Sequence, residues 1–371
     1  MSTLATNAIT DASGGNTTTI NGYTPTMSNM AGRNRIINGD MRIDARNAGA
    51  SVATSSDFGA YTVDRFYVRH VTDGALTFQQ VTDAPTGFVN SLKVTVTTTD
   101  SSIASTQRAW IAQFIEGLNV ADLAWGTASA SNVTLSFWVK SSVTGTFCCS
   151  IINSASNRGY PVNYTVNSAN TWEQKTVTIS GDTSGTWLTT NGIGLRVYFP
   201  VTAGTYYQGT NATWNASEAM CTSSQTNLMA TNGATFYITG VQLEAGSVAT
   251  PFEHRQYGQE LALCQRYCQV LSYVNGDRDI ATGVIYSSTA GNAVRSFPTV
   301  MRAAPTLTAS GLSDIQTYQA GNSFVPTAIS LDRSAPTTVT LFTTISGATQ
   351  GHGSWLRLNG SSAKLELSAE L

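Results

Sequence analysis

The chain has 371 residues, more than one ordinary domain, and a formal net charge of −2 from 20 basic and 22 acidic residues. Charged residues make up only 11% of the sequence and hydrophobic residues 41%, so hydroxyl and amide groups supply most of the surface polarity. Because the sequence shows no basic stripe, no bilayer-length apolar run and no secretory signal, we expect neither a nucleic-acid partner nor membrane insertion.

Residues 1–33 are poor in large apolar side chains and contain Gly14-Gly15 and Asn21-Gly22. Such a segment cannot bury enough surface to fold alone. Two interpretations remain open: an extended N-terminal arm that attaches to another subunit, or a disordered leader.

Residues 34–255 contain many short runs in which apolar and polar residues alternate, separated by Gly, Asn and Ser. This pattern is typical of half-buried antiparallel strands, as in residues 91–96, 133–139 and 236–241. So many strands over this length predict an all-β, two-sheet sandwich of the jelly-roll type.

Three residues near the two ends of this predicted sandwich carry hard oxygen ligands. Asn38 and Asp40 belong to an Asn-Gly-Asp sequence, and Glu244 follows an apolar strand. If the first and last strands are neighbours, the three could form a structural calcium site. The alternative is that Asn38-Gly39-Asp40 is a turn and Glu244 a solvated or ion-paired residue.

Aromatic residues in loop-like sequence are the candidates for ligand contact. Trp187, Tyr207 and Trp214 lie in stretches rich in Gly, Ser, Thr and Asn, where flat rings and small hydrogen-bonding groups suit a sugar. Trp138 and Trp172 lie in or beside strands, and we expect them in the core.

Residues 256–274 contain the one convincing helical pattern, in which Tyr257, Leu261, Cys264, Cys268 and Leu271 share a face. Packing against a sheet and a helix bundle at a symmetry axis are both open. The alternating pattern typical of strands resumes over residues 275–371, which predicts a second, smaller β-sandwich domain.

No catalytic signature accompanies the three histidines, and no period of 20 to 50 residues predicts a β-helix. We therefore expect no enzyme activity. The five cysteines form no zinc spacing, and reduced thiols from cytoplasmic assembly are expected.

Scattered motifs across nearly the whole chain resemble a family of phage tail-fibre and virion appendage proteins. The motifs are residues 32–41 (GRNRIINGDM), 61–66 (YTVDRF), 237–246 (YITGVQLEAG), 250–255 (TPFEHR), 257–267 (YGQELALCQRY), 297–305 (FPTVMRAAP) and 368–371 (SAEL). Residues 90–235 are more loosely similar to jelly-roll carbohydrate-binding modules.

The resemblance implies a structural protein of the virion, in the tail or another appendage, that attaches to tail or neck proteins through residues 1–33. It further implies a homotrimer whose β domains bind a glycan of the host surface. The alternative is a purely architectural tail adaptor or head decoration protein that binds only virion proteins. A glycan-active enzyme is less well supported, because no catalytic signature is present.

Overall fold

The computed structural model describes residues 32–273 and 279–371, so almost all of the predicted arm, residues 1–33, lies outside the described residues. The chain divides into two compact units. Unit 1 comprises the residues up to Arg42 together with Gly49–Thr62 and Phe66–Arg255. Unit 2 comprises Ile43–Ala48, Val63–Arg65 and Gln256–Leu371.

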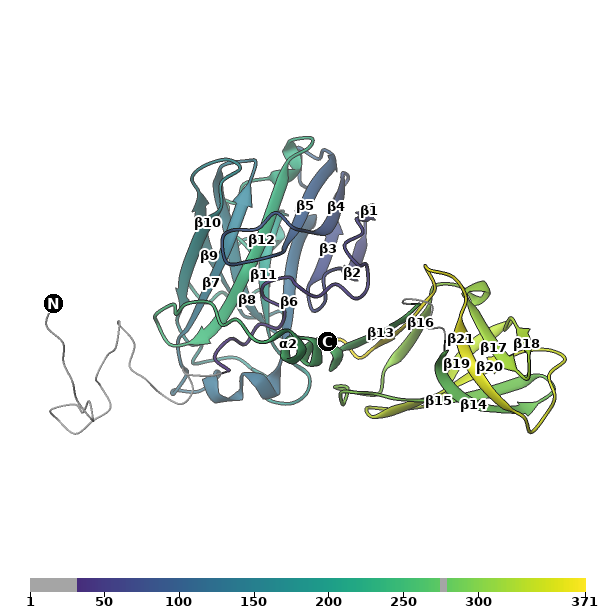
Figure 1. Cartoon of the computed structure of the whole chain (residues 1–371). Helices are drawn as coiled ribbons and strands as arrows, with labels where there is room; N and C mark the ends of the chain where they lie inside the picture. Colours follow the sequence, from purple (N-terminus) through teal and green to yellow (C-terminus); the bar gives the residue numbers. More distant parts are fainter. Residues whose placement is uncertain (1–31, 274–278) are drawn as a thin grey trace, which may run out of the picture. The chain divides into compact units, whose positions relative to one another are not determined.

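Unit 1 is a sandwich of two six-stranded antiparallel sheets, which we call sheet A and sheet B (Figure 1). Sheet A has the order β1 (Val52–Thr54), β4 (Ala75–Val81), β5 (Ser91–Thr98), β12 (Thr235–Ala245), β7 (Val133–Ser141) and β10 (Glu173–Ile179). Sheet B has the order β2 (Phe58–Tyr61), β3 (Tyr67–Val71), β6 (Arg108–Glu116), β11 (Ile193–Ala203), β8 (Gly145–Asn153) and β9 (Gly159–Val166). Short 3-10 helices lie at Gly117–Asn119, Ala121–Leu123, Thr205–Tyr207 and Leu228–Ala230.

The core of unit 1 lies between the two sheets. Phe137, Phe147, Phe199 and Phe236 are fully buried and come from strands of both sheets. Successive residues of a strand point to opposite faces, so the alternating sequence buries one set and leaves hydroxyl and aromatic side chains outside. The predicted all-β jelly-roll sandwich is confirmed.

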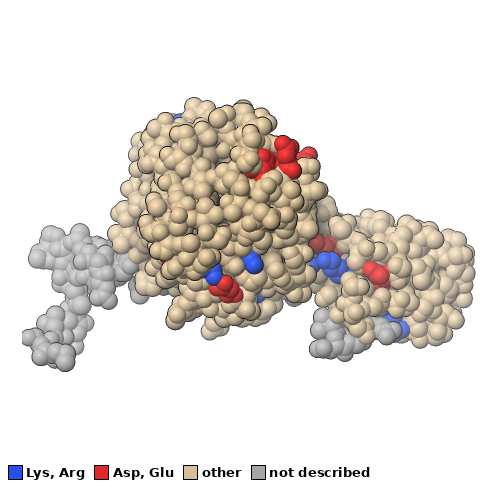
Figure 2. Space-filling model, turned by 90° about the horizontal axis from the view of Figure 1, so that it is seen from above, with Lys and Arg blue, Asp and Glu red and all other residues tan. Residues whose placement is uncertain are grey.

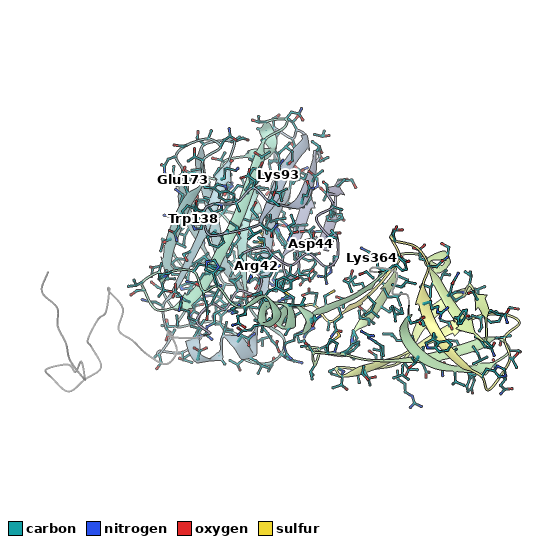
Figure 3. The ribbon with its side chains drawn as sticks, viewed as in Figure 1. Arg42, Asp44, Lys93, Trp138, Glu173 and Lys364 are labelled. Atoms are coloured by element: carbon teal, nitrogen blue, oxygen red, sulfur yellow. The ribbon has the colours of Figure 1, made fainter. Side chains whose placement is uncertain are left out.

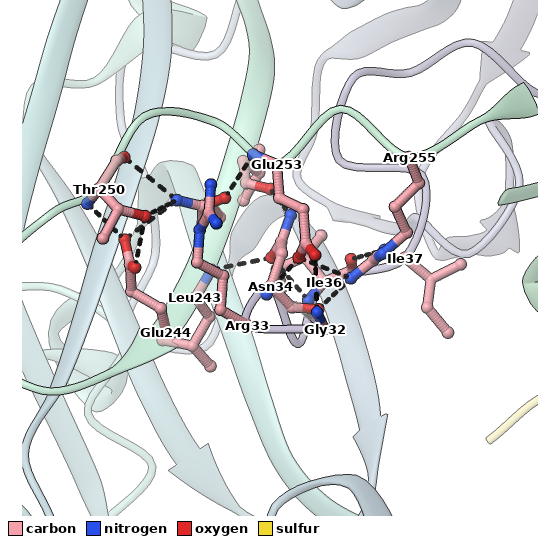
Figure 4. A network of polar contacts seen from close by, with 12 residues as sticks. Gly32, Arg33, Asn34, Ile36, Ile37, Leu243, Glu244, Thr250, Glu253 and Arg255 are labelled. Carbon is pink, nitrogen blue, oxygen red and sulfur yellow. Dashed lines mark hydrogen bonds and ion pairs between the residues drawn. The ribbon is translucent and has the colours of Figure 1, made fainter. Parts of the chain in front are cut away.

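The segment that opens unit 1 is held against β12 by one buried amide (Figure 4). Asn34 Oδ1 accepts hydrogen bonds from the backbone N–H groups of Ile36 (2.9 Å) and Leu243 (3.1 Å), and Asn34 Nδ2 donates to Val241 O (3.2 Å). Asn34 is only 4% exposed, so these groups have no access to water as an alternative partner. The amide therefore fixes the register between residues 34–36 and β12.

Three more side chains complete this network. Glu253 accepts hydrogen bonds from the backbone N–H groups of Gly32 (2.7 Å) and Asn34 (2.8 Å), and Arg255 donates to the Asn34 carbonyl. Gln242, on β12, accepts a hydrogen bond from Glu253 N (2.8 Å). We call Asn34, Gln242, Glu253 and Arg255 the polar clamp. It joins the two ends of the unit 1 sequence to the middle strand β12.

Unit 2 contains the helix α2 (Tyr257–Gln265) and two antiparallel sheets. The three-stranded sheet has the order β13 (Cys268–Ser272), β22 (Lys364–Ser368) and β16 (Thr306–Ala309). The seven-stranded sheet has the order β18 (Asn322–Phe324), β17 (Ile315–Gln319), β21 (Gly353–Leu358), β14 (Asp279–Ser287), β15 (Ala290–Ser296), β20 (Thr338–Thr344) and β19 (Ala328–Ala335). A 3-10 turn lies at Leu312–Asp314. In the described part of the chain, no helix has the length and apolar character to cross a bilayer.

The predicted helical face was wrong beyond Gln265. Cys268 and Leu271 lie on β13, where they pair with Ser368 and Leu365 of β22. An isolated helix of nine residues is only marginally stable. The residues that follow the helix instead satisfy their backbone hydrogen bonds by pairing with β22. Local periodicity over two turns could not reveal a partner strand almost a hundred residues away.

Buried ion pairs tie the three segments of unit 2 together. Arg65 is 1% exposed, adopts a left-handed backbone (φ 71°), lies 3.5 Å from the ring centroid of Tyr267 and forms an ion pair with Glu370. Arg46 forms ion pairs with Glu366 (2.9 Å) and Glu370 (3.2 Å). The left-handed Arg65 backbone persists because these contacts hold the side chain in place.

We expect Asn34→Ala to lower the free energy of unfolding of unit 1 by about 3 kcal/mol, because it leaves buried backbone groups without partners. Arg33→Ala is the matched control: the Arg33 guanidinium is bonded to Pro251 O at an exposed position, and its loss should cost less than about 1 kcal/mol. Urea unfolding measures both. Equal effects of the two substitutions would contradict a central role for the Asn34 amide.

Burial raises the pKa of Asp64 in unit 2 to about 6, although Arg46 opposes the shift. The folded state therefore binds this proton more tightly than the unfolded chain, where the pKa is 3.8. The resulting stabilisation is complete below about pH 4 and is lost as the pH rises through 6; it is on the order of 3 kcal/mol. Hydrogen exchange of the β13 and β22 amides at pH 4.5 and 7 should show this loss in the wild type and a smaller one in Asp64→Asn. The same pH dependence in both proteins would rule out Asp64 as the titrating group.

Candidate functional site

Two of the aromatic residues predicted to contact a ligand lie together. The ring centroids of Trp187 and Trp214 are 5.4 Å apart, and Trp125 lies 4.7 Å from the first and 5.5 Å from the second, all edge to face. Tyr160 adds a fourth ring at 5.0 Å from Trp214. The sequence separated these residues by up to 89 positions, and the fold brings them into one loop cluster.

The polar atoms of this cluster already have partners. The indole N–H groups of Trp125 and Trp214 donate to backbone carbonyls at 2.7 and 2.9 Å, and that of Trp187 donates to Asp182 at 3.2 Å. Asp182 also binds Arg158 through two hydrogen bonds of 2.8 and 2.6 Å. A small adjacent hollow is lined mainly by apolar groups such as Val120, Leu123, Leu188 and Leu195. The cluster fastens the loops at one end of the sandwich, and ligand contact there stays a prediction.

The third candidate, Tyr207, is not exposed as the sequence predicted. Its side chain is only 5% exposed and packs in a cluster with Trp110, Tyr198 and Met220. The neighbouring Tyr206 is 63% exposed instead. In the 3-10 turn Thr205–Tyr207, consecutive side chains point in different directions, so loop-like composition could not tell which tyrosine faces solvent.

Trp138 and Trp172, which the sequence placed in the core, are half-buried instead. Trp138 projects from the outer face of sheet A, where it lies against Gly240, a glycine with φ +60° at which a Cβ atom would approach the indole to 2.9 Å (Figure 3). The error arose because apolar residues on both faces of a strand look alike in sequence.

The predicted calcium ligands have protein partners. Glu244 is 2% exposed, and its two carboxylate oxygens accept hydrogen bonds from Thr250 N (2.8 Å), Thr250 Oγ1 (2.7 Å) and Gln242 Nε2 (3.0 Å). Asp40 forms an ion pair with Arg42, and Asn38 adopts a left-handed conformation (φ 58°) at the start of the turn that contains Asp40. No group of three or more His, Cys, Asp or Glu side chains suited to a metal occurs within residues 32–273 and 279–371. The turn and ion-pair interpretation fits these contacts.

His70 and the five cysteines are enclosed by the fold. His70 is fully buried between Thr54 Oγ1 (2.9 Å) and Thr72 Oγ1 (2.6 Å), and burial lowers its pKa. All five cysteines are buried free thiols, and burial raises the pKa of each. Raised thiol pKa values and lack of solvent access make these groups poor nucleophiles.

A second group of aromatic residues lies on the outer face of sheet B. Tyr67 and Phe114 are stacked at 5.6 Å with an interplanar angle of 30°, and Trp110 lies 5.8 Å from Tyr67 and 4.8 Å from Tyr198. Arg196, opposite Phe114 in the β6–β11 register, places its guanidinium 5.4 Å from the Phe114 centroid. We call Tyr67, Trp110, Phe114, Arg196 and Tyr198 the aromatic face.

The aromatic face is partly open to solvent. Tyr67, Phe114 and Arg196 are half-buried, whereas Trp110 and Tyr198 are 5% and 2% exposed and support them from below. The Trp110 indole N–H is buried without a hydrogen-bond partner among the described residues. An unpaired buried donor costs about 1–3 kcal/mol.

Polar groups border these rings. Glu218 lies near Arg108 and Arg196; burial raises the pKa of its carboxyl, and the two guanidinium groups oppose that shift. Arg69 on β3 lies opposite Trp110 in the register with β6. Rings flanked by guanidinium, carboxyl and hydroxyl groups can stack on the C–H face of a sugar and bond to its hydroxyls.

Sequence reasoning missed the aromatic face because its residues come from three strands, β3, β6 and β11, and alternate with core residues. Ile111 and Val197 are fully buried, and Phe114 and Tyr198 lie an odd number of positions from them on the same strands, so they point to the opposite face of the sheet. The sequence shows this alternation. It does not show that residue 67 pairs with the strand at 110–114, or that this strand pairs with the one at 196–198.

Comparison with protein-family models and with curated proteins gave no match. Among solved structures, the chain is similar to the enzymatically active domain of tailspike protein 4 of bacteriophage CBA120 (15% identity, TM-score 0.30), covering 57% of this chain and only 21% of that one. It is also similar to a putative sugar binding protein of Bacteroides thetaiotaomicron (13% identity, TM-score 0.32; 58% and 100% covered). A family 11 carbohydrate-binding module of Clostridium thermocellum in complex with a mixed-linked tetrasaccharide is a third (12% identity, TM-score 0.27; 56% and 100% covered). At this level of similarity, the activities in these names belong to those proteins.

We expect Trp187→Ala to lower the free energy of unfolding of unit 1 by about 2 kcal/mol, roughly half the cost for a fully buried tryptophan. An exposed loop position would predict almost no loss of stability, whereas the ring packing and the Asp182 hydrogen bond predict a clear one. Tyr206→Ala, at a 63% exposed ring, should change stability by less than about 0.5 kcal/mol. Thermal melting of both variants decides between these expectations, and a normal melting curve for Trp187→Ala would return this residue to the ligand-binding candidates.

Proposed function

We propose that this chain is a non-enzymatic structural protein of a phage virion, located in the tail or another appendage, whose unit 1 binds a glycan of the host surface. In this proposal the chain is assembled in the host cytoplasm as a homotrimer, and residues 1–33 attach it to other virion proteins. The observation that carries the glycan-binding role is the half-exposed stacked pair of Tyr67 and Phe114 on the aromatic face.

The physical support is the mixture of groups at that face. The C–H groups of a pyranose ring pack on a flat aromatic ring, and hydroxyls need donors and acceptors at the ring edge. Arg196 is held by Ser156 Oγ (2.6 Å) and Ser154 O (2.9 Å), so its guanidinium is pre-positioned beside Phe114. Because these side chains are ordered before a ligand arrives, less entropy is lost on binding.

The purely architectural role remains the second candidate, and the polar clamp favours it. Residues 32–41, 237–246 and 250–255, which carry much of the resemblance to virion appendage proteins, supply the clamp. They hold the fold together and take no part in the aromatic face. The resemblance therefore supports a shared framework more directly than a shared ligand.

The test is binding of the purified chain to an array of bacterial surface glycans. We expect the wild type to bind at least one glycan, and Tyr67→Ala and Phe114→Ala each to weaken that binding by about tenfold or more, since a base or ring stacked on an aromatic side chain contributes about 1–3 kcal/mol. Tyr286→Ala in unit 2, at a ring that is 64% exposed, is the matched control and should bind normally. Melting curves of each variant separate lost binding from lost folding. If the wild type binds no glycan, the architectural role replaces the proposal; if both variants bind normally, the aromatic face is not the site.

A further inference from the structure

Sheet A carries a row of cations and rings on its outer face. Tyr237 on β12 lies directly opposite Lys93 of β5 on one side and Lys140 of β7 on the other. The Lys140 Nζ is 4.3 Å and the Lys93 Nζ 5.5 Å from the Tyr237 ring centroid. Trp172, just before β10, lies 6.1 Å from Tyr237 and 5.2 Å from the Lys140 Nζ. We call Lys93, Lys140, Trp172 and Tyr237 the lysine row (Figure 3 labels Lys93).

The two lysines of this row differ in their pairing. Lys140 forms an ion pair with Asp83, whose other carboxylate oxygen accepts a hydrogen bond from the Trp172 indole at 3.2 Å. The hydrogen bond from Lys140 lowers the pKa of Asp83, and the nearby positive charge of Lys93 lowers it further, so this carboxylate stays charged. Lys93 has no ion pair within the part of the chain that the structure describes. The two ammonium groups and the one carboxylate therefore leave a net positive charge beside the rings.

This charge is unusual for the protein. Only 11% of the residues are charged, and the view in Figure 2 shows few basic side chains on a largely uncharged surface. The attraction between a lysine ammonium and an aromatic ring is worth roughly 0.5–1 kcal/mol at an exposed site. It holds the ammonium near the ring and does not neutralise its charge. An anion that reaches Lys93 thus meets an ammonium whose position is already restricted.

We propose that the lysine row is a second glycan-binding site, selective for acidic sugars that carry a carboxylate or phosphate group. A sugar ring lies on Tyr237 or Trp172, and its anionic group binds the Lys93 ammonium. The side chains of Lys93 and Lys140 leave strands two positions apart in the sheet, about 10 Å, so a ring over Tyr237 lies within reach of both. A lysine ammonium is a compact point charge, and it suits a single anionic group that does not match the planar fork of a guanidinium.

This site is distinct from the aromatic face, because the two lie on the outer faces of different sheets of unit 1. It goes beyond the proposed function by naming the charge of a ligand. One assay with variants at both places separates the two proposals.

The experiment compares binding of the full chain to polygalacturonate and to its fully methyl-esterified form, which has the same backbone without the charge. We expect the wild type to prefer polygalacturonate, and Lys93→Gln to lower that affinity about tenfold while leaving binding to the ester unchanged. Lys93→Arg should keep the preference, because it keeps the charge. Raising the salt concentration from about 0.05 to 0.5 M should weaken the wild type more than Lys93→Gln, since screening acts on the ion pair.

Lys175→Gln is the matched charge control: it removes a positive charge from β10 of the same sheet, but that ammonium is paired with Glu173. It should bind polygalacturonate nearly as the wild type does. A wild type that does not distinguish the two polymers, or a Lys93→Gln variant that binds as the wild type does, overturns the inference. If Tyr67→Ala abolishes all polysaccharide binding while Lys93→Gln has no effect, the aromatic face remains as the proposed binding site and the lysine row is rejected as one.

Discussion

The sandwich of unit 1 depends on closing its first segment onto its last strand, and one buried amide does most of this. Asn34 satisfies backbone groups on both sides of the junction, while Glu253 and Arg255 bind the backbone of residues 32–36 from the segment that follows β12. Gly39 fits beneath Val241 only because it has no side chain, since a Cβ atom would approach the Val241 carbonyl to 2.1 Å. With both chain ends fixed at β12, the sheets on either side have a defined middle strand and register.

This arrangement explains why the parts of the sequence with the most specific motifs are not the parts with ligand chemistry. Buried polar groups need particular partners at particular positions, because an unmatched donor or acceptor costs more than a mismatched apolar contact. The clamp residues are therefore strongly determined by the fold. Outward-facing, half-buried positions such as Tyr67 and Lys93 are less constrained, so their identity reports more on what the surface does.

Much of the fold was predictable because strand alternation is a local signal. The many short strands, the two-sheet sandwich of unit 1 and the β character of unit 2 all follow from residues two apart having the same environment. What the sequence could not provide was pairing between distant segments. The end of α2 depends on β22 pairing with Cys268–Ser272, and the assignment of 43–48 and 63–65 to unit 2 depends on Arg46 and Arg65 reaching the last residues of the chain.

The candidate sites were predictable only in part, for the same reason. Trp187 and Trp214 could be recognised as loop residues, but not as members of a ring cluster whose indole N–H groups are already bonded. The aromatic face and the lysine row each need three or more strands in register before their side chains become neighbours.

The polar clamp fixes the register of the sandwich, so residues on both outer faces can vary without loss of that register. The aromatic face uses rings from sheet B, and the lysine row uses rings and ammonium groups from sheet A, so neither shares a residue with the clamp. Binding a repeating polysaccharide through two weak faces increases avidity without any change in the core, provided that the polymer can reach both. A low overall charge assists this, because with few competing ionic groups on the surface a single lysine such as Lys93 can decide whether an acidic or a neutral polymer is retained.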